Sequence, residues 1–216
     1  MIQNYEDYIK EELDFKKFFK KDLYHLNNKT KKDDLNNVHL DIDPFNEEDW
    51  DIDNLSPLLQ IVRKTYGNKP YDEILGLDCS ENHLTTLEGV ENLVSLERLY
   101  CYNNHLTSLE GVENLVNLEE IYCGGNQLTS LESVKNLVNL EELSCYNNQL
   151  TSLEGIENLV NLERLYCYYN QLTSLEGVEN LVNLDILSCD NNRFNREYKI
   201  YLEEYCRNKN IQSWIW

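Results

Sequence analysis

The sequence has few of the features that mark membrane-spanning, exported or nucleic-acid-binding proteins. No apolar run approaches the roughly 18 residues that a transmembrane helix needs. The start of the chain, MIQNYEDYIKEELDF, lacks the apolar stretch of a signal peptide. Basic residues are scarce, with 19 Lys and Arg against 39 Asp and Glu, so the formal net charge is −20. A chain this acidic repels nucleic acids and anionic membranes, and we expect neither as a partner.

Ligand patterns for metal ions are also missing. The seven cysteines include no close C-x₂₋₄-C pair of the kind that structural zinc sites commonly use. The acidic stretch 41–53 suggests calcium at first sight, but it lacks the glycine of an EF-hand loop and is interrupted by Pro44. No serine–histidine–aspartate or cysteine–histidine arrangement stands out. We therefore expect no metal, no cofactor and no enzymatic activity.

The dominant feature of the sequence is a repeat with a period of 22 residues. One unit, LEELSCYNNQLTSLEGIENLVN over 140–161, recurs almost unchanged on both sides of itself. The period is marked by Cys79, Cys101, Cys123, Cys145, Cys167 and Cys189, and by Asn82, Asn104, Asn126, Asn148, Asn170 and Asn192. The pattern is L-x-x-L-x-L-x-x-N-x-L with cysteine in place of the third leucine. Such a fixed period is typical of leucine-rich repeats.

Each unit contains two kinds of apolar spacing. Leu143 and Cys145 alternate with Ser144, which predicts a short strand with the two apolar side chains on one face. Apolar residues then recur at every third position from Leu150 to Leu159, a spacing that favours 3₁₀-like turns over an α-helix. One coil cannot bury these residues alone. We therefore expect the coils to stack and their strands to form a parallel sheet.

Two repeat positions have predicted structural roles. Asn148 lies where the strand turns away, and its amide can both donate to and accept from backbone groups of adjacent coils. The repeat cysteines fall on the interior face, where a thiol behaves as a small apolar side chain. Reduced, buried thiols indicate a reducing compartment, so we expect an intracellular, cytoplasmic location.

The six L-x-C-x-x-N-x-L cores and the intervening L-x-x-L-E-G-V-E-N-L-V-N segments resemble the 22-residue repeats of internalins and of a regulatory subunit of type-1 protein phosphatase. The resemblance extends from about Ile74 to Phe194. It implies an α/β leucine-rich-repeat solenoid with a parallel β-sheet on the concave face and short 3₁₀-like turns on the convex face. Internalins carry leucine or isoleucine where this chain has cysteine.

The repeat divides the chain into three predicted parts. Residues 1–73 are interpreted as an N-terminal helical cap region with polar and acidic loops. Residues 74–194 are interpreted as six leucine-rich repeats, and residues 195–216 as a C-terminal cap made of a helix and a short apolar tail. The ends of a solenoid need such polar covers because the outermost coils have no neighbour on one side.

Two helices are predicted in the N-terminal part. Apolar spacing over 1–26 predicts a basic amphipathic helix, which we interpret as a cap rather than as a segment for a membrane or a calmodulin-like partner. A short helix over 54–66, with Pro57 near its start and Gly67 just after its end, should cover the first coil.

The C-terminal part is predicted to close the other end of the stack. A helix over 195–208 should place four side chains on one face, namely Tyr198, Tyr201, Leu202 and Tyr205. Phe194 should join the interior ladder in place of leucine. We expect the tail IQSWIW to pack on this cap, the alternative being that Trp214 and Trp216 anchor another protein.

Function is expected on the outward side chains of the strands, which differ between repeats whereas the interior positions hardly vary. Tyrosine and arginine are enriched at binding hot spots. The predicted binding residues are Tyr100, Tyr102, Tyr122, Tyr146, Tyr166, Tyr168, Tyr169, Arg98, Arg164, Glu120 and Glu142. We predict a monomeric protein-interaction module, an adaptor or regulator with an unidentified protein partner. The alternatives are a carbohydrate or small-ligand binder that uses the same aromatic face, and tyrosine stacking that only stabilises the sheet.

Two histidines occupy one position in successive repeats. His83 and His105 lie where the strand ends, and later repeats have glutamine there, at Gln127, Gln149 and Gln171. We interpret this as a variable position and not as part of a catalytic site.

Overall fold

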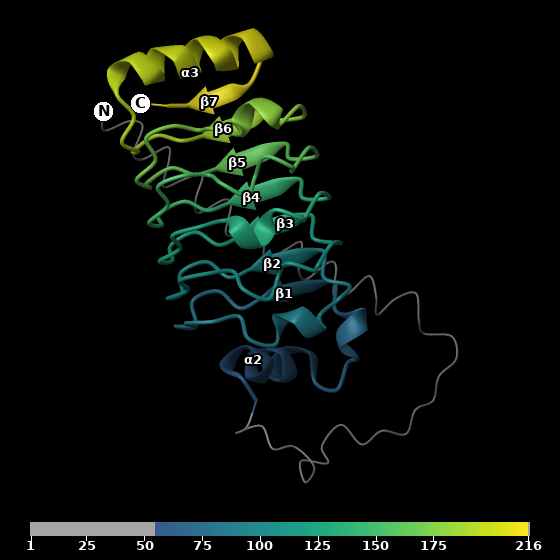
Figure 1. Cartoon of the computed structure of the whole chain (residues 1–216). Helices are drawn as coiled ribbons and strands as arrows, with labels where there is room; N and C mark the ends of the chain where they lie inside the picture. The colour runs from purple at the N-terminus through teal and green to yellow at the C-terminus, as the bar shows by residue number, and fades with distance from the viewer. Residues whose placement is uncertain (1–54, 216) are drawn as a thin grey trace. The chain divides into compact units, whose positions relative to one another are not determined.

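A computed structural model describes residues 55–215 of the chain, with the exception of the side chain of Trp214 (Figure 1). These residues form a stack of coils joined by one seven-stranded sheet in the order β1-β2-β3-β4-β5-β6-β7. All neighbouring strands are parallel, which confirms the predicted sheet. The predicted helix over 1–26, the polar loop after it and the acidic stretch 41–53 lie outside the described residues.

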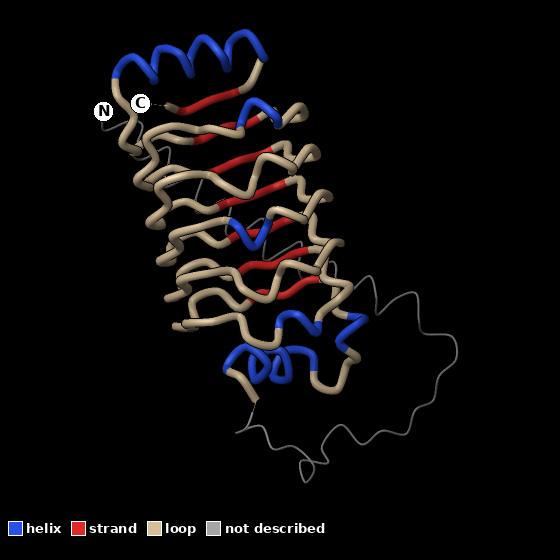
Figure 2. Tube along the Cα trace, in the orientation of Figure 1, coloured by secondary structure: helices blue, strands red, loops and turns tan. Residues whose placement is uncertain are grey.

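Each strand contains three residues and comes from a successive coil (Figure 2). The strands are β1 (Gly76–Asp78), β2 (Arg98–Tyr100), β3 (Glu120–Tyr122), β4 (Glu142–Ser144), β5 (Arg164–Tyr166), β6 (Ile186–Ser188) and β7 (Gln212–Trp214). The first six share one register, in which each residue pairs with the residue 22 positions later. Equivalent side chains of adjacent coils are therefore neighbours, on both faces of the sheet.

The core lies between the strands and the return segments of the coils. The central leucine or isoleucine of β1 to β6 and the cysteine after each of these strands are fully buried. Three return segments contain a 3₁₀ helix, namely η4 (Val90–Asn92), η5 (Glu132–Val134) and η6 (Val178–Asn180). In the other coils the same segment has hydrogen bonds from a backbone N–H to the carbonyl three residues earlier, for example from Val112 N to Leu109 O at 3.3 Å. These segments confirm the predicted 3₁₀-like turns.

The N-terminal end of the described stack is covered by a short helix, as expected. Helix α2 (Pro57–Tyr66) begins after Ser56, whose hydroxyl accepts a hydrogen bond from Leu59 N at 3.3 Å. It ends at Gly67, where φ is 60°. Leu58 and Val62 are buried in the core, and η3 (Tyr71–Glu73) leads from this helix into β1.

The C-terminal helix has the predicted position, and its tyrosines lie on one side as predicted, with ring centroids 5.7 Å apart for Tyr198 and Tyr201 and 6.3 Å apart for Tyr201 and Tyr205. Helix α3 (Arg196–Lys209) begins after Asn195, whose side chain accepts from Tyr198 N at 2.8 Å. Leu202 and Cys206 are buried, whereas Tyr201 is 55% exposed. The buried side of the helix is therefore narrower than its row of tyrosines. Positions 202 and 206 are one turn apart and share the inward face.

The apolar tail forms a seventh strand, which the sequence did not predict. β7 pairs with β6 in parallel, with Gln212 opposite Ile186, and Gln212 N donates to Asp185 O at 2.8 Å. Ile211 and Ile215 on either side of it are buried, and Figure 1 shows β7 between β6 and α3. The tail packs against the C-terminal helix as expected, and it does so as a strand. The tail extends the sheet, and α3 is the crossover that joins the two parallel strands.

Candidate functional site

The outward side chains of the strands, and of the three residues that follow each of them, form a surface that we call the strand face. This is the face on which the binding residues were predicted. Register places Arg98, Glu120, Glu142 and Arg164 next to one another in four successive strands. Their order predicts ion pairs at both ends of the row and two adjacent carboxylates at its centre.

The row forms these ion pairs. Arg98 Nε donates to Glu120 Oε1 at 3.2 Å, and Arg164 pairs with Glu142 through Nε. Arg164 Nη1 also donates to Glu163 Oε2 at 3.2 Å. Burial raises the pKa of Glu142, while hydrogen bonds from Tyr122 and Arg164 act in the opposite direction. The four charged residues of the row thus form two ion pairs, Arg98 with Glu120 and Arg164 with Glu142.

Two of the predicted tyrosines are buried in this surface. Tyr100 and Tyr122 are 3% and 4% exposed, and their rings meet edge to face with centroids 4.9 Å apart. Tyr100 Oη donates to Glu120 Oε2 at 2.7 Å. Burial, followed by the nearby Glu120 carboxylate, strongly raises the pKa of Tyr100, and burial with Glu142 does the same for Tyr122. These phenols remain protonated and add little ring surface for a partner.

Three other tyrosines form a continuous strip across adjacent coils. The rings of Tyr146 and Tyr168 are stacked, with centroids 5.0 Å apart and planes 11° apart. Tyr169 meets Tyr168 edge to face at 5.7 Å, has a left-handed backbone with φ 53°, and is 45% exposed. We call these three residues the tyrosine strip.

The tyrosine strip rests on a glycine that the sequence did not single out. A Cβ at Gly124 would lie 2.1 Å from Cε1 of Tyr146, so the Tyr146 ring occupies the place of the missing side chain. Gly124 precedes Tyr146 in the same column of successive coils. This close packing could have been predicted from the sequence, because Gly124 and Tyr146 occupy equivalent positions in successive repeats.

The two remaining tyrosines are half-buried and lie outside this strip. Burial raises the pKa of Tyr102, with Asp78 and Glu81 adding to the effect. Tyr166 lies opposite Ser144 on one side and Ser188 on the other. The seven predicted tyrosines are therefore not one cluster. Five of them form one buried pair and the tyrosine strip, and Tyr102 and Tyr166 belong to neither group.

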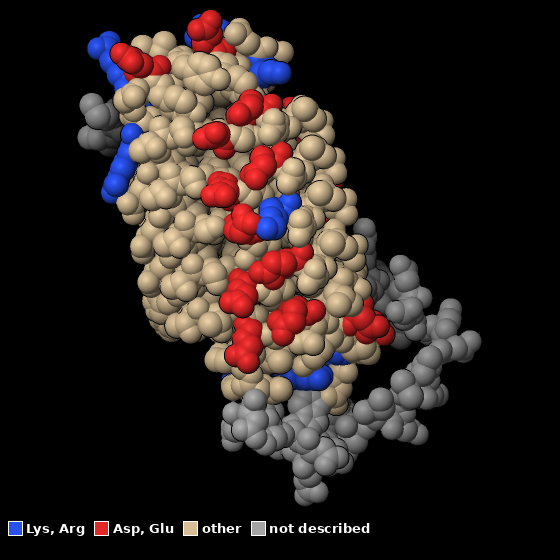
Figure 3. All heavy atoms as spheres, viewed as in Figure 1, with Lys and Arg blue, Asp and Glu red and all other residues tan. Residues whose placement is uncertain are grey.

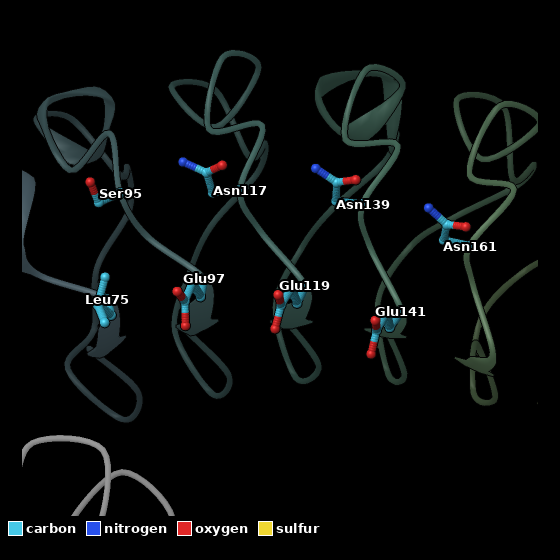
Figure 4. Close-up of a pocket in the computed structure, with 8 residues that line it drawn as sticks. All are labelled: Leu75, Ser95, Glu97, Asn117, Glu119, Asn139, Glu141 and Asn161. Atoms are coloured by element: carbon cyan, nitrogen blue, oxygen red, sulfur yellow. The ribbon is translucent and has the colours of Figure 1, made fainter. Parts of the chain in front are cut away.

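A groove along one flank of the stack was not predicted. It has a volume of about 410 Å³ and lies between a row of glutamates and a row of asparagines (Figure 4). The glutamates are Glu97, Glu119 and Glu141, and the asparagines are Asn117, Asn139 and Asn161. Each of these asparagines donates to a valine carbonyl of the preceding coil, at 2.9–3.2 Å. The asparagine row therefore joins the coils, and the glutamate row makes the groove acidic.

The face of the 3₁₀ turns carries much of the acidic charge. Figure 3 shows acidic side chains in two rows along this face. Part of this charge is structural, because Glu113 and Glu157 accept from the N–H of Gly111 and Gly155 at 2.8 and 2.7 Å. Those glycines have φ near 105°, a conformation that favours glycine.

Residues 55–215 contain neither a three-residue metal site nor a membrane-spanning helix. Among these residues, no group of three or more His, Cys, Asp or Glu side chains could hold a metal ion. No helix in the described part of the chain is long and apolar enough to cross a membrane. All seven cysteines are buried and none forms a disulfide in this structure.

The fold and the strand face together define a repeat solenoid with an aromatic surface on its sheet. A model of the family described as "Leucine Rich repeats (2 copies)" matches residues 75–114, 116–158 and 160–196. The chain belongs to the leucine-rich repeat family. Proteins of this family typically mediate protein–protein interactions and act as binding modules.

Solved structures give the same fold. An internalin, InlF of Listeria monocytogenes, is 24% identical with a TM-score of 0.60, over 65% of this chain and 40% of that chain. The leucine-rich repeat protein LIC12759 of Leptospira interrogans is 33% identical with a TM-score of 0.62, over 66% and 37%. This chain thus spans about two fifths of the length of each. No curated protein matches it.

Proposed function

We propose that the leucine-rich repeats of this chain form a protein-binding module that recognises its partner on the strand face, with the tyrosine strip at the centre of the contact. The observation that carries this proposal is the stacked arrangement of Tyr146 and Tyr168 in adjacent coils, beside the exposed ring of Tyr169. Central aromatic side chains usually supply most of the binding free energy of an interface.

The packing of the tyrosine strip supports a recognition role. Tyr146 is seated over Gly124 and stacked on Tyr168, so its ring is already ordered before a partner binds. An ordered aromatic side chain loses little conformational entropy on binding. The tyrosine strip therefore offers contact area to a partner with little loss of conformational entropy on binding.

The electrostatics of the strand face support a partner that is not selected by charge alone. Arg98 and Arg164 are paired with Glu120 and Glu142, so these charges are largely balanced within the row. The proposed contact depends on ring area and hydrogen bonds more than on long-range attraction. The proposal includes an intracellular location, which the buried thiols favour because they suit a reducing compartment.

A carbohydrate or small ligand is the second candidate. Exposed tyrosine rings such as Tyr169 can stack on a sugar ring, which gives this candidate a specific basis. Small-ligand sites are usually concave pockets. The groove of the stack, however, is lined by Glu97, Asn117 and their repeat equivalents and not by the tyrosine strip. A protein partner therefore fits the strand face better.

The test compares three forms of the full chain as affinity baits: wild type, Tyr146→Ala/Tyr168→Ala, and the control Glu110→Gln/Glu154→Gln on the opposite face. A partner identified by mass spectrometry should bind wild type and control alike. The tyrosine variant should bind it at least about 30-fold more weakly, which corresponds to about 2 kcal/mol, the usual hot-spot threshold. Gly124→Ala, which displaces the Tyr146 ring without removing it, should weaken binding in the same direction.

The outcome that contradicts the proposal is a partner that binds the tyrosine variant as well as wild type. Loss of binding in the Glu110→Gln/Glu154→Gln control would move the site to the acidic face. Binding of wild type to a glycan array, abolished by the same tyrosine substitutions, would favour the second candidate.

A further inference from the structure

We propose that His83 and His105 form a two-histidine chelating site for a divalent transition-metal ion, with Zn²⁺ as the representative ion. His83 Nδ1 and His105 Nε2 face each other at 3.3 Å, and their ring centroids are 5.4 Å apart. A tetrahedral Zn²⁺ at 2.0–2.1 Å from two imidazole nitrogens holds them about 3.3–3.4 Å apart. The separation of the two nitrogens therefore matches that of a bidentate site, and a rotation of each ring directs its lone pair at the ion.

The proton positions required for this site are those of ordinary neutral imidazoles. Each histidine must direct a lone pair at the ion, so the proton of His83 lies on Nε2 and that of His105 on Nδ1. In the absence of an ion, one proton between the two facing nitrogens makes a hydrogen bond instead. Both side chains lie on exposed residues, so an ion in solution can reach them.

The backbone that carries the two histidines is fixed by a buried amide. Asn104 Oδ1 accepts hydrogen bonds from Asn82 N at 3.0 Å and from Leu84 N at 2.9 Å, the two residues that flank His83. Asn104 is only 4% exposed and immediately precedes His105. One buried side chain therefore positions the turns of both histidines.

Three further hydrogen bonds hold the site in place. Asn104 Nδ2 donates to the carbonyl groups of Cys79 and Cys101, both at 3.0 Å, which fixes the amide itself. His105 N donates to Leu84 O at 2.8 Å and links the two coils directly. His83 has a left-handed backbone with φ 58°, which the surrounding hydrogen bonds maintain. Ligands held in this way lose little entropy when an ion binds.

The chemistry of the position restricts the site to the first two repeats. The equivalent position is glutamine in the next three coils, at Gln127, Gln149 and Gln171. Imidazole is a good ligand for zinc, copper and nickel, whereas an amide suits harder ions. The net charge of −20 also attracts cations to the surface. Two protein ligands leave the other coordination positions to water, so the site is open and not a closed structural site.

The experiment is calorimetric titration of the full chain with Zn²⁺ alone, in a buffer that does not bind the ion. Wild type should bind one more Zn²⁺ per chain than His83→Gln and than His105→Gln. Glutamine occupies this position in three coils of the same stack, so His105→Gln should fold with the melting temperature of wild type. His83 has a left-handed backbone that these glutamines lack, so the melting temperature of His83→Gln is measured beside its Zn²⁺ isotherm. The matched control is His25→Gln/His39→Gln, which removes the other two of the four histidines and should retain the site.

Identical Zn²⁺ isotherms for wild type and both single variants would overturn the proposal and leave the pair as a hydrogen bond only. Loss of the extra ion in the His25→Gln/His39→Gln control, with retention in the His83 and His105 variants, would also overturn it. The outcome is independent of the tyrosine strip, because the assay uses no protein partner.

Discussion

Replacement of Asn148 by leucine tests the buried amide ladder that joins the coils. Asn148 Oδ1 accepts from Leu128 N at 2.9 Å in the preceding coil. Its Nδ2 lies 3.1 Å from each of three carbonyl oxygens, those of Cys123, Cys145 and Tyr146. Leucine has a similar size but none of these hydrogen-bonding groups. The substitution therefore removes one acceptor and one donor group from the interior.

The size of the loss in the free energy of unfolding depends on which backbone groups keep another hydrogen-bond partner after the substitution. The Cys123 carbonyl still accepts from Asn126 Nδ2 and the Cys145 carbonyl from Asn170 Nδ2, both at 3.0 Å. Leu128 N loses its acceptor in a buried position. One unsatisfied buried N–H costs roughly 1–3 kcal/mol, and the weakened contacts to the carbonyls add about 1 kcal/mol. We expect a loss of about 2–4 kcal/mol in the free energy of unfolding.

Urea denaturation of the full chain, followed by circular dichroism, measures this loss as a lower midpoint at an unchanged slope. The matched control is Asn82→Leu at the first position of the same ladder. Asn82 is exposed, and its Nδ2 donates only locally, to Ser80 O at 2.7 Å. This variant should stay within about 0.5 kcal/mol of wild type. Equal midpoints for Asn148→Leu and wild type would refute a structural role for the ladder.

Two further predictions concern the interior and the C-terminal end. Burial raises the pKa of the Cys79 and Cys145 thiols to about 12. A thiol reagent at pH 8 should therefore label few of the seven buried cysteines in the native protein and all of them in denaturant. Rapid labelling of the repeat cysteines in the native protein would contradict this. Ile215 is buried just after β7, so Ile215→Ala should lower the free energy of unfolding by about 2–5 kcal/mol. The control Gln212→Ala, at an exposed position of the same tail, should change this free energy by less than about 0.5 kcal/mol. Equal urea midpoints for the two variants would show that the tail is dispensable for stability.

The interior could be predicted from the sequence because its environment repeats with the residues. Leu143 and Cys145 meet the same neighbours in every coil, namely their own equivalents 22 positions away. The period therefore determines both which side chains are buried and how the strands are paired. Asn148 follows the same logic, because the backbone groups that it satisfies also recur in each coil.

The C-terminal cap could not be predicted in the same way, because it lies outside the period. The tail has no strand pattern long enough to identify, and β7 exists because the open edge of β6 offers unpaired backbone groups. Cys206 is buried and Tyr201 exposed because α3 must pack across that edge and over β7. The buried face of α3 depends on this contact as much as on the spacing of its own residues.

The strand face could be predicted in part, less fully than the interior and more fully than the C-terminal cap. The period correctly assigned its side chains to columns, but a column determines only which residues are neighbours. How they pack depends on the differences between repeats. Tyr146 leans over Gly124 because that one coil lacks a side chain there, and Tyr100 is buried beside Glu120 because that coil supplies a carboxylate. The same variation that prevents prediction of the surface from a single repeat also makes one part of the surface different from the next, which is what selective binding of a partner requires.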